Sequence, residues 1–99
     1  MNTAEILKHV DHTLLKPIAT WEDIQKICDE SIEYNTASIC IPSCYISRIN
    51  EKYGDKVNIC TVVGFPLGYS TTEAKVLEAK QAIENGANEI DMVINISDV

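Results

Sequence analysis

The chain lacks the features that mark membrane-spanning, secreted and nucleic-acid-binding proteins. No apolar run in its 99 residues approaches the length of about 18–20 residues that crosses a bilayer. Residues 1–10 carry no secretory signal pattern. Lys and Arg form no cluster, and the net charge is −7. Because nucleic acids and anionic membranes both bind through basic surfaces, we expect neither as a partner.

The CxxC spacing of redox-active cysteine pairs is also absent. The four cysteines, Cys28, Cys40, Cys44 and Cys60, form no CxxC motif. An even number of cysteines is compatible with disulfides in a secreted domain, but no signal sequence supports that reading. We therefore expect reduced thiols and a cytoplasmic location.

No cofactor or metal motif is recognisable. Residues 64–68 (GFPLG) lack the Lys-Ser/Thr of a P-loop and do not match GxGxxG. Their glycines suit a turn, although they would also let the backbone approach a ligand. His9 and His12 have no further ligand at a suitable spacing, and no Ser-His-Asp arrangement can be argued from the order of residues. We expect no cofactor and no metal.

What the sequence does contain is a regular alternation of helix-like and strand-like segments. Its composition, 45% hydrophobic and 23% charged, is that of a globular domain. Helices are predicted at residues 3–9, 20–35, 43–52 and 70–85, and strands at residues 10–15, 37–41, 57–63 and 89–94.

The helix ends carry sequence signals of their own. Thr20 is a predicted N-cap, and the spacing of Ser70 and Glu73 is that of a capping box. Gly86 is a predicted C-terminal cap. In the helix before it we expect a buried apolar face made by Val76, Ala79 and Ile83.

Strands that alternate with helices predict a parallel sheet with right-handed crossovers. Four such strands make half of an eight-stranded barrel, whose typical length of about 250 residues is far more than the 99 present here. We predict an α/β fold: a parallel (β/α) half-barrel, the N-terminal portion of a TIM (β/α)8 barrel with a leading helix. Residues 1–99 would form a single partial domain.

Strand alternation selects four candidate site residues. Successive side chains point to opposite faces of a strand, and the aliphatic face should meet the helices. This places Asp11, Thr13, Cys40 and Asp91 toward the barrel interior. An inward carboxylate is costly unless it is paired or hydrogen-bonded, so an inward Asp near the end of a strand is the kind of residue that a barrel enzyme uses.

Each candidate also has a structural interpretation. Asp91 would equally cap a turn or lie on an exposed strand face. Cys40 fits a small core residue better than a nucleophile. Asp11 would also serve as a partner of Lys16 or of nearby backbone donors. Spacing alone leaves these alternatives open.

Four blocks of sequence resemble the deoxyribose-phosphate aldolase family in order and spacing, and together they cover nearly the whole chain. They are DHTLLKPIAT (residues 11–20), ASICIPSCY (37–45), TVVGFPLG (61–68) and EAK…AIENGANEIDMVINI (73–96). The family is a metal-free class I aldolase on a (β/α)8 barrel. It reversibly joins acetaldehyde and glyceraldehyde 3-phosphate to give 2-deoxyribose 5-phosphate through a Schiff base.

The resemblance implies roles for the four candidates. Asp91 would relay protons through a water, Cys40 would lie close to the substrate without being the Schiff-base nucleophile, and Asp11 and Thr13 would line the pocket. It also implies a small phosphorylated sugar or aldehyde as the substrate, and we expect a homo-oligomer.

One departure is large. The KTSTG-like and KASGG-like strands that hold the family's two active-site lysines do not occur here. Lys16, Lys75 and Lys80 are expected to be solvated. We therefore expect a fragment that is inactive by itself. The alternatives are a non-catalytic half-barrel that self-associates through its open sheet edge and a small phosphate-binding α/β module that uses residues 64–68.

Overall fold

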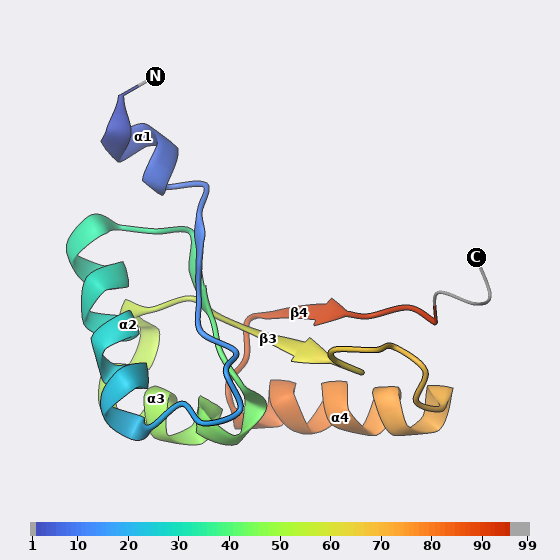
Figure 1. Cartoon of the computed structure of the whole chain (residues 1–99). Helices are drawn as coiled ribbons and strands as arrows, with labels where there is room; N and C mark the ends of the chain where they lie inside the picture. Colours follow the sequence, from blue (N-terminus) through green and yellow to red (C-terminus); the bar gives the residue numbers. More distant parts are fainter. Residues whose placement is uncertain (1, 96–99) are drawn as a thin grey trace.

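The structure is a computed structural model that describes residues 2–95, and its strands and helices alternate as predicted (Figure 1). Four strands form one sheet in the order β1-β2-β3-β4, and all neighbouring strands are parallel. This confirms the predicted fold class. The elements are α1 (Thr3–Leu7), β1 (Asp11–Thr13), α2 (Trp21–Tyr34), β2 (Ser38–Cys40), the 3-10 turn η1 (Ser43–Tyr45), α3 (Ile46–Tyr53), the 3-10 turn η2 (Gly54–Lys56), β3 (Ile59–Val63), α4 (Thr72–Asn85) and β4 (Glu89–Met92).

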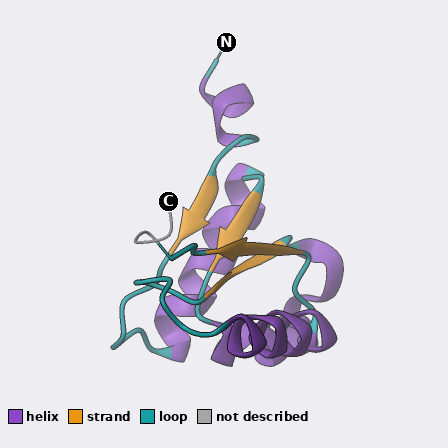
Figure 2. Cartoon of the chain, turned by 90° about the vertical axis from the view of Figure 1, so that its right-hand side faces the viewer, coloured by secondary structure: helices purple, strands orange, loops and turns teal. Residues whose placement is uncertain are grey.

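The helices pack on one side of the sheet, and the core lies between the two layers. Figure 2 shows this arrangement, with α1 standing apart near the N-terminus. No residue of α1 is buried. The core is dominated by isoleucines, each of which stabilises the fold by about 1.5–3 kcal/mol when fully buried. Its fully buried isoleucines are Ile24, Ile39, Ile41, Ile46, Ile49 and Ile59.

The ends of α2 are set by local hydrogen bonds. The hydroxyl of Thr20 accepts from the Asp23 backbone N–H at 3.2 Å, and the Asp23 carboxylate accepts from the Thr20 N–H at 3.0 Å. This reciprocal pair is a capping box, and it confirms Thr20 as the N-cap. The helix ends where Asn35 adopts a left-handed conformation with φ 52°.

The start of α4 differs from the prediction. Thr71, not Ser70, is the N-cap, and its hydroxyl accepts from the Ala74 N–H at 3.2 Å. The N-cap is the residue whose backbone is extended just before the helix begins. Ser and Thr are both favoured at this position, so the residue type alone does not show which of two neighbours is the cap. Gly86 ends the helix with φ 120°, as predicted.

The predicted buried face of α4 was also wrong. Val76 and Ile83 are exposed by 56% and 59%, and Leu77 beside them by 57%. The helix is rotated so that Ala82, buried to 2%, faces the core instead. Within residues 2–95 nothing covers the larger apolar side chains, so periodicity identified the helix but not the side that is buried here.

The strands are shorter than predicted, because ladder pairing stops where a neighbouring strand ends. Flanking residues still make single backbone bonds, such as Leu14 N–H to Cys40 C=O at 2.9 Å and Val93 N–H to Val63 C=O at 2.9 Å. The predicted helix at 43–52 begins as a 3-10 turn, and Ser43 makes no side-chain cap there.

None of the helices in residues 2–95 combines the length and the apolar composition needed to cross a bilayer.

Candidate active site

The face of the sheet opposite the helices, called here the inner face, carries mainly small polar side chains. Strand register pairs Asp11 with Ser38 and Thr13 with Cys40. Cys40 pairs in turn with Cys60 of β3. Because side chains alternate along each strand, these residues share one face across adjacent strands.

Asp91 joins this face from β4. It pairs with Val62 of β3, and one of its carboxylate oxygens lies within 4.8 Å of the sulfur atoms of Cys40 and Cys60. Asp91 is exposed, whereas Cys40 and Cys60 are 4% and 0% exposed. The carboxylate therefore keeps its contact with water while its neighbours are buried, which reduces the desolvation cost expected for an inward charge.

The two thiols of the inner face stay protonated at neutral pH. Burial raises the pKa of Cys40, and the nearby carboxylates of Asp91 and Asp11 add to the rise. Burial also raises the pKa of Cys60, with further contributions from Cys40 and Asp91. Because the thiolate is the nucleophilic form of cysteine, this environment argues against either sulfur as a nucleophile.

Asp11 is held by the neighbouring strand. Its carboxylate accepts a hydrogen bond of 2.6 Å from the hydroxyl of Ser38. The structural interpretation of Asp11 predicts Lys16 or a nearby backbone donor as its partner, whereas in the structure the partner is a side-chain hydroxyl. The hydroxyl of Thr13 donates to the Asp11 carbonyl at 2.9 Å. Both side chains are exposed on the inner face, so they remain accessible to a ligand.

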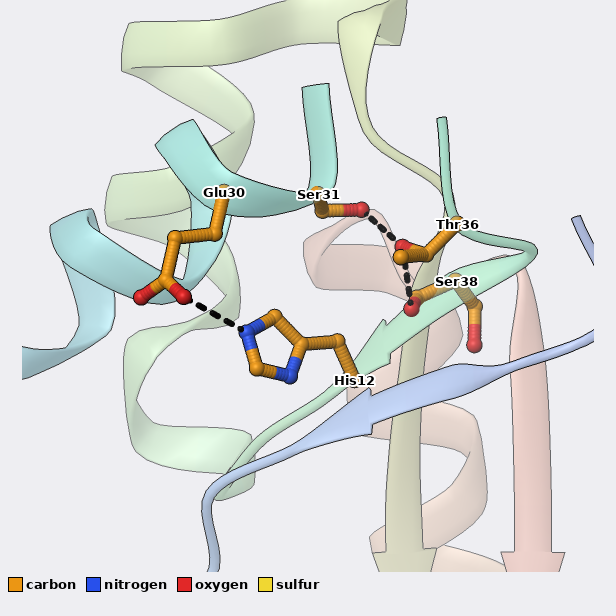
Figure 3. Close-up of polar contacts among 5 residues, drawn as sticks. All are labelled: His12, Glu30, Ser31, Thr36 and Ser38. Atoms are coloured by element: carbon orange, nitrogen blue, oxygen red, sulfur yellow. Dashed lines mark hydrogen bonds and ion pairs between the residues drawn. The ribbon is translucent and has the colours of Figure 1, made fainter. Parts of the chain in front are cut away.

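Polar contacts on the opposite side of β1 and β2 connect the sheet to α2 (Figure 3). His12 lies 3.5 Å from the carboxylate of Glu30. The hydroxyls of Ser31 and Thr36 are hydrogen-bonded, and Thr36 also donates to the Ser38 carbonyl at 3.2 Å. His12 therefore serves the packing of helix on sheet and is remote from the inner face.

The loop after β3 is held by α4. The Gly64 N–H donates to the Glu78 carboxylate at 2.8 Å, and Lys75 donates from Nζ to the Gly68 carbonyl at 2.6 Å. Gly68 has φ 78°, and a Cβ added there would meet the Ile94 carbonyl oxygen at 2.1 Å. A glycine is required at this position because the loop passes directly against the chain that follows β4.

The predicted solvent exposure of the lysines is confirmed for two of the three. Lys16 and Lys80 are exposed, in agreement with the prediction. Lys75 is partly buried and engaged by the loop, so the expectation of a freely solvated amine was wrong for it. No lysine lies within the four described strands.

Two residues of the inner face were not anticipated as site residues. Ser38 holds Asp11, and Cys60 lies between Cys40 and Asp91 in strand order. Alternation within β2 does place Ser38 and Cys40 on one face. The proximity of Cys60 to both neighbours depends on the register between strands, which the sequence does not display.

Comparisons with known proteins agree on one family. A family model described as DeoC/LacD family aldolase matches residues 6–98. The deoxyribose-phosphate aldolase of Clostridium botulinum (strain Alaska E43 / Type E3) is 84% identical over 99 residues, which are 100% of this chain and 45% of that protein. The deoxyribose-phosphate aldolase of Clostridioides difficile (strain 630) is 61% identical over 94 residues, covering 95% of this chain and 43% of that protein.

A solved structure shows the same arrangement of strands and helices. The tetrameric deoxyribose phosphate aldolase from Aeropyrum pernix superposes with a TM-score of 0.89 at 34% identity, over 95% of this chain and 41% of that one. The chain thus spans less than half the length of these relatives. Since the family model matches almost every residue and the parallel (β/α) architecture agrees with it, the chain belongs to the DeoC/LacD family of aldolases.

Proposed function

We propose that this chain supplies the first four strands of a deoxyribose-phosphate aldolase site. The reaction is the reversible Schiff-base cleavage of 2-deoxyribose 5-phosphate into acetaldehyde and glyceraldehyde 3-phosphate. The observation that carries the proposal is the position of Asp91, a solvated carboxylate near the carboxyl end of β4 and beside Cys40 of β2. Active sites of (β/α) barrels form at the carboxyl ends of the strands.

Asp91 is proposed as the acid–base group. In the cleavage direction the substrate aldehyde and a lysine amine form an iminium ion with loss of water. Asp91, acting through a water, takes the proton from the C3 hydroxyl as the C2–C3 bond breaks and the electron pair moves to the iminium nitrogen. Returning that proton to C2 of the enamine, followed by hydrolysis, releases acetaldehyde.

The other candidates contribute to binding. Cys40 lies next to Asp91 as a neutral thiol and would contact the substrate without attacking it. Asp11 and Thr13 are exposed on the same face and would accept or donate hydrogen bonds to substrate hydroxyls. No cofactor or metal is needed for this scheme.

These 99 residues alone are proposed to be inactive. A Schiff base needs an amine whose pKa is lowered by burial or by a second cation. Lys16 and Lys80 are exposed, and Lys75 is committed to the loop after β3. For the whole enzyme we propose a cytoplasmic homo-oligomer that acts on small phosphorylated substrates and binds neither nucleic acid nor membranes.

A chimera tests the catalytic proposal. These 99 residues would replace the matching part of the Clostridium botulinum relative, to which they are 84% identical. At this identity we expect the chimera to fold. We expect acetaldehyde release from 2-deoxyribose 5-phosphate. Asp91→Asn should lower kcat by about 100-fold or more, whereas Asp55→Asn, a matched change at an exposed site in η2, should leave it unaltered. Full activity of the Asp91→Asn chimera would remove Asp91 from the mechanism.

Borohydride trapping tests the inactivity of the chain alone. The chain is incubated with acetaldehyde and reduced, and intact mass and peptide mapping locate the adducts. We expect only scattered surface labelling. A saturable adduct on a single lysine would show that these residues already contain an activated amine.

A second candidate function is self-association of the half-barrel. It is favoured by the exposed apolar side chains Val76, Leu77 and Ile83 of α4 and by Met92 and Ile94 at the last strand. Two copies related by a twofold axis would cover these surfaces. Sedimentation should give a discrete dimer that Ile83→Glu dissociates and that Lys26→Glu, at an exposed position of α2 outside this surface, does not. A monomer at all concentrations would contradict it.

The phosphate-binding alternative has less support. Two backbone donors of the loop after β3 already have partners, since Gly64 N–H donates to Glu78 and Gly68 N–H donates to the Gly64 carbonyl at 2.8 Å. The Glu78 carboxylate also places a negative charge at the loop, which opposes an anion.

A further inference from the structure

The aldolase scheme leaves Cys60 without a role. Its sulfur is fully buried, yet it lies on the same face as Cys40 and Asp91 and within reach of both. Within residues 2–95 these three form the one group of at least three Cys, His, Asp or Glu side chains whose ligand atoms come together. The group is distributed over three adjacent strands, β2, β3 and β4.

We propose that Cys40, Cys60 and Asp91 form a binding site for a thiophilic divalent cation of the zinc and cadmium type. Two sulfur ligands and one carboxylate oxygen match the preference of these ions for thiolates with a mixed donor set. Three protein ligands leave a fourth tetrahedral position, which would be taken by water. Asp91 is exposed, so that position opens toward solvent on the inner face.

The spacing fits a single ion. Zn–S bonds are about 2.3 Å and Zn–O bonds about 2.0–2.2 Å, so ligand atoms around a tetrahedral ion lie roughly 3.5–3.8 Å apart. The two sulfurs and the carboxylate oxygen already lie within 4.8 Å of one another. Modest side-chain rotation closes the difference, and the in-register pairing of Cys40 with Cys60 fixes the backbone beneath them.

A disulfide is the competing fate of two neighbouring thiols. Cys40 and Cys60 are free thiols in the structure, and a disulfide between them would require an oxidant. An ion can be bound by both sulfurs without oxidation of either.

A divalent ion fits the charge balance of the two thiols. On binding, each thiol releases its proton to solvent and the ion replaces the two protons, so no redox partner is required. The bound ion would also occupy Asp91, so metal binding and the proton relay proposed for Asp91 exclude each other. The cation would thus inhibit an aldolase that contains this half.

Cadmium titration of the reduced 99-residue chain tests the site directly. Thiolate-to-cadmium charge-transfer absorption in the ultraviolet reports sulfur ligation and does not depend on aldolase activity. We expect a band that saturates at one Cd²⁺ per chain, is removed by excess Zn²⁺ or a chelator, and is unaffected by Mg²⁺. Absence of a saturable band would overturn the proposal.

Variants assign the ligands. Cys40→Ser and Cys60→Ser should each weaken cadmium binding by at least about 10-fold and lower the band. Cys44→Ser, at an exposed cysteine outside the cluster, should leave both unchanged. Asp91→Asn, at an exposed position, should keep the band and weaken binding by about 10-fold. A site that persists in Cys60→Ser, or disappears in Cys44→Ser, contradicts the assignment.

Buried serines at these positions could also unfold the chain, so circular dichroism accompanies each titration. If a variant loses its helical signal, cadmium NMR of the unmodified chain decides instead. A resonance in the range of two-sulfur coordination supports the site, and one in the range of oxygen-only or single-sulfur coordination overturns it.

Discussion

Cys40 and Cys60 are in-register neighbours on β2 and β3, and their sulfur atoms lie within 4.8 Å of each other on the inner face. Both are buried, as is Cys28 in the helix-side core, whereas Cys44 is exposed. The chain therefore contains exposed and buried thiols whose behaviour can be compared directly.

The first prediction concerns thiol reactivity. We expect iodoacetamide to alkylate Cys44 first and the three buried cysteines much later. Burial raises the pKa of Cys28 from 9.0 to about 11, which lowers its thiolate fraction about 100-fold before any steric protection. Peptide mapping over time measures the order, with the denatured chain as the control. Labelling of Cys28 as fast as Cys44 in the folded chain would contradict the burial.

Alkaline stability is the second prediction. The raised pKa of Cys28 means that the folded chain keeps its proton where the unfolded chain has lost it. The resulting contribution to the free energy of unfolding is complete below about pH 9 and is lost as pH rises through about 11. Tyr53, with its pKa raised to about 12 by burial and by Asp29, acts in the same direction at higher pH.

Thermal unfolding at several pH values measures this effect. Cys28→Ala should have a lower Tm at neutral pH because a small cavity forms, but its Tm should fall less steeply between pH 9 and 11. Cys44→Ala should keep the wild-type slope. Identical slopes in all three proteins would show that Cys28 does not titrate with folding.

The third prediction concerns the stability of the Gly68→Ala variant. The new methyl group would meet the Ile94 carbonyl oxygen at 2.1 Å, and the residue would retain φ 78°. Backbone cannot move aside as a flexible side chain can, so we expect a loss of about 1–3 kcal/mol in the free energy of unfolding. Urea denaturation measures it. Gly54→Ala shares the positive φ, 57°, but has open space around its Cβ, and it should cost less. Equal losses would mean that the close approach is unimportant.

The fourth prediction separates two possible caps of α4. Thr71→Ala removes the hydroxyl that accepts from the Ala74 N–H, so it should cost about 0.5–2 kcal/mol of stability. Ser70→Ala removes no cap and should change the stability by less than about 0.5 kcal/mol. Urea midpoints of the two variants decide between them. A larger loss of stability in Ser70→Ala than in Thr71→Ala would show that Ser70 is the cap.

The local signals in the sequence were sufficient to predict the elements and several of their ends. Thr20 with Asp23 starts α2, and Gly86 ends α4, because each residue satisfies or terminates its own helix through contacts a few residues away. Alternation of strands and helices predicted the parallel sheet because short connections leave few other topologies.

The candidate site could be predicted only in part. Alternation within single strands was enough to put Asp11, Thr13, Cys40 and Asp91 on one face, and the role of each stays a prediction. The partner of Asp11 could not be predicted, since Ser38 lies 27 residues away in the chain and is brought there by strand pairing. The buried side of α4 was wrong for a related reason: Val76 and Ile83 have the period of a core face, but the core contacts Ala82 instead.

The sequence by itself determined the order and approximate position of the strands and helices and which side chains share a face, because these properties depend on residues a few positions apart. Only the tertiary structure decided that Cys40, Cys60 and Asp91 meet, that Lys75 is held by the Gly68 carbonyl, and that Asp11 is held by Ser38. These contacts join segments far apart in the chain. They depend on strand register and on the rotation of each helix about its axis, which are set by the packing of the whole sheet.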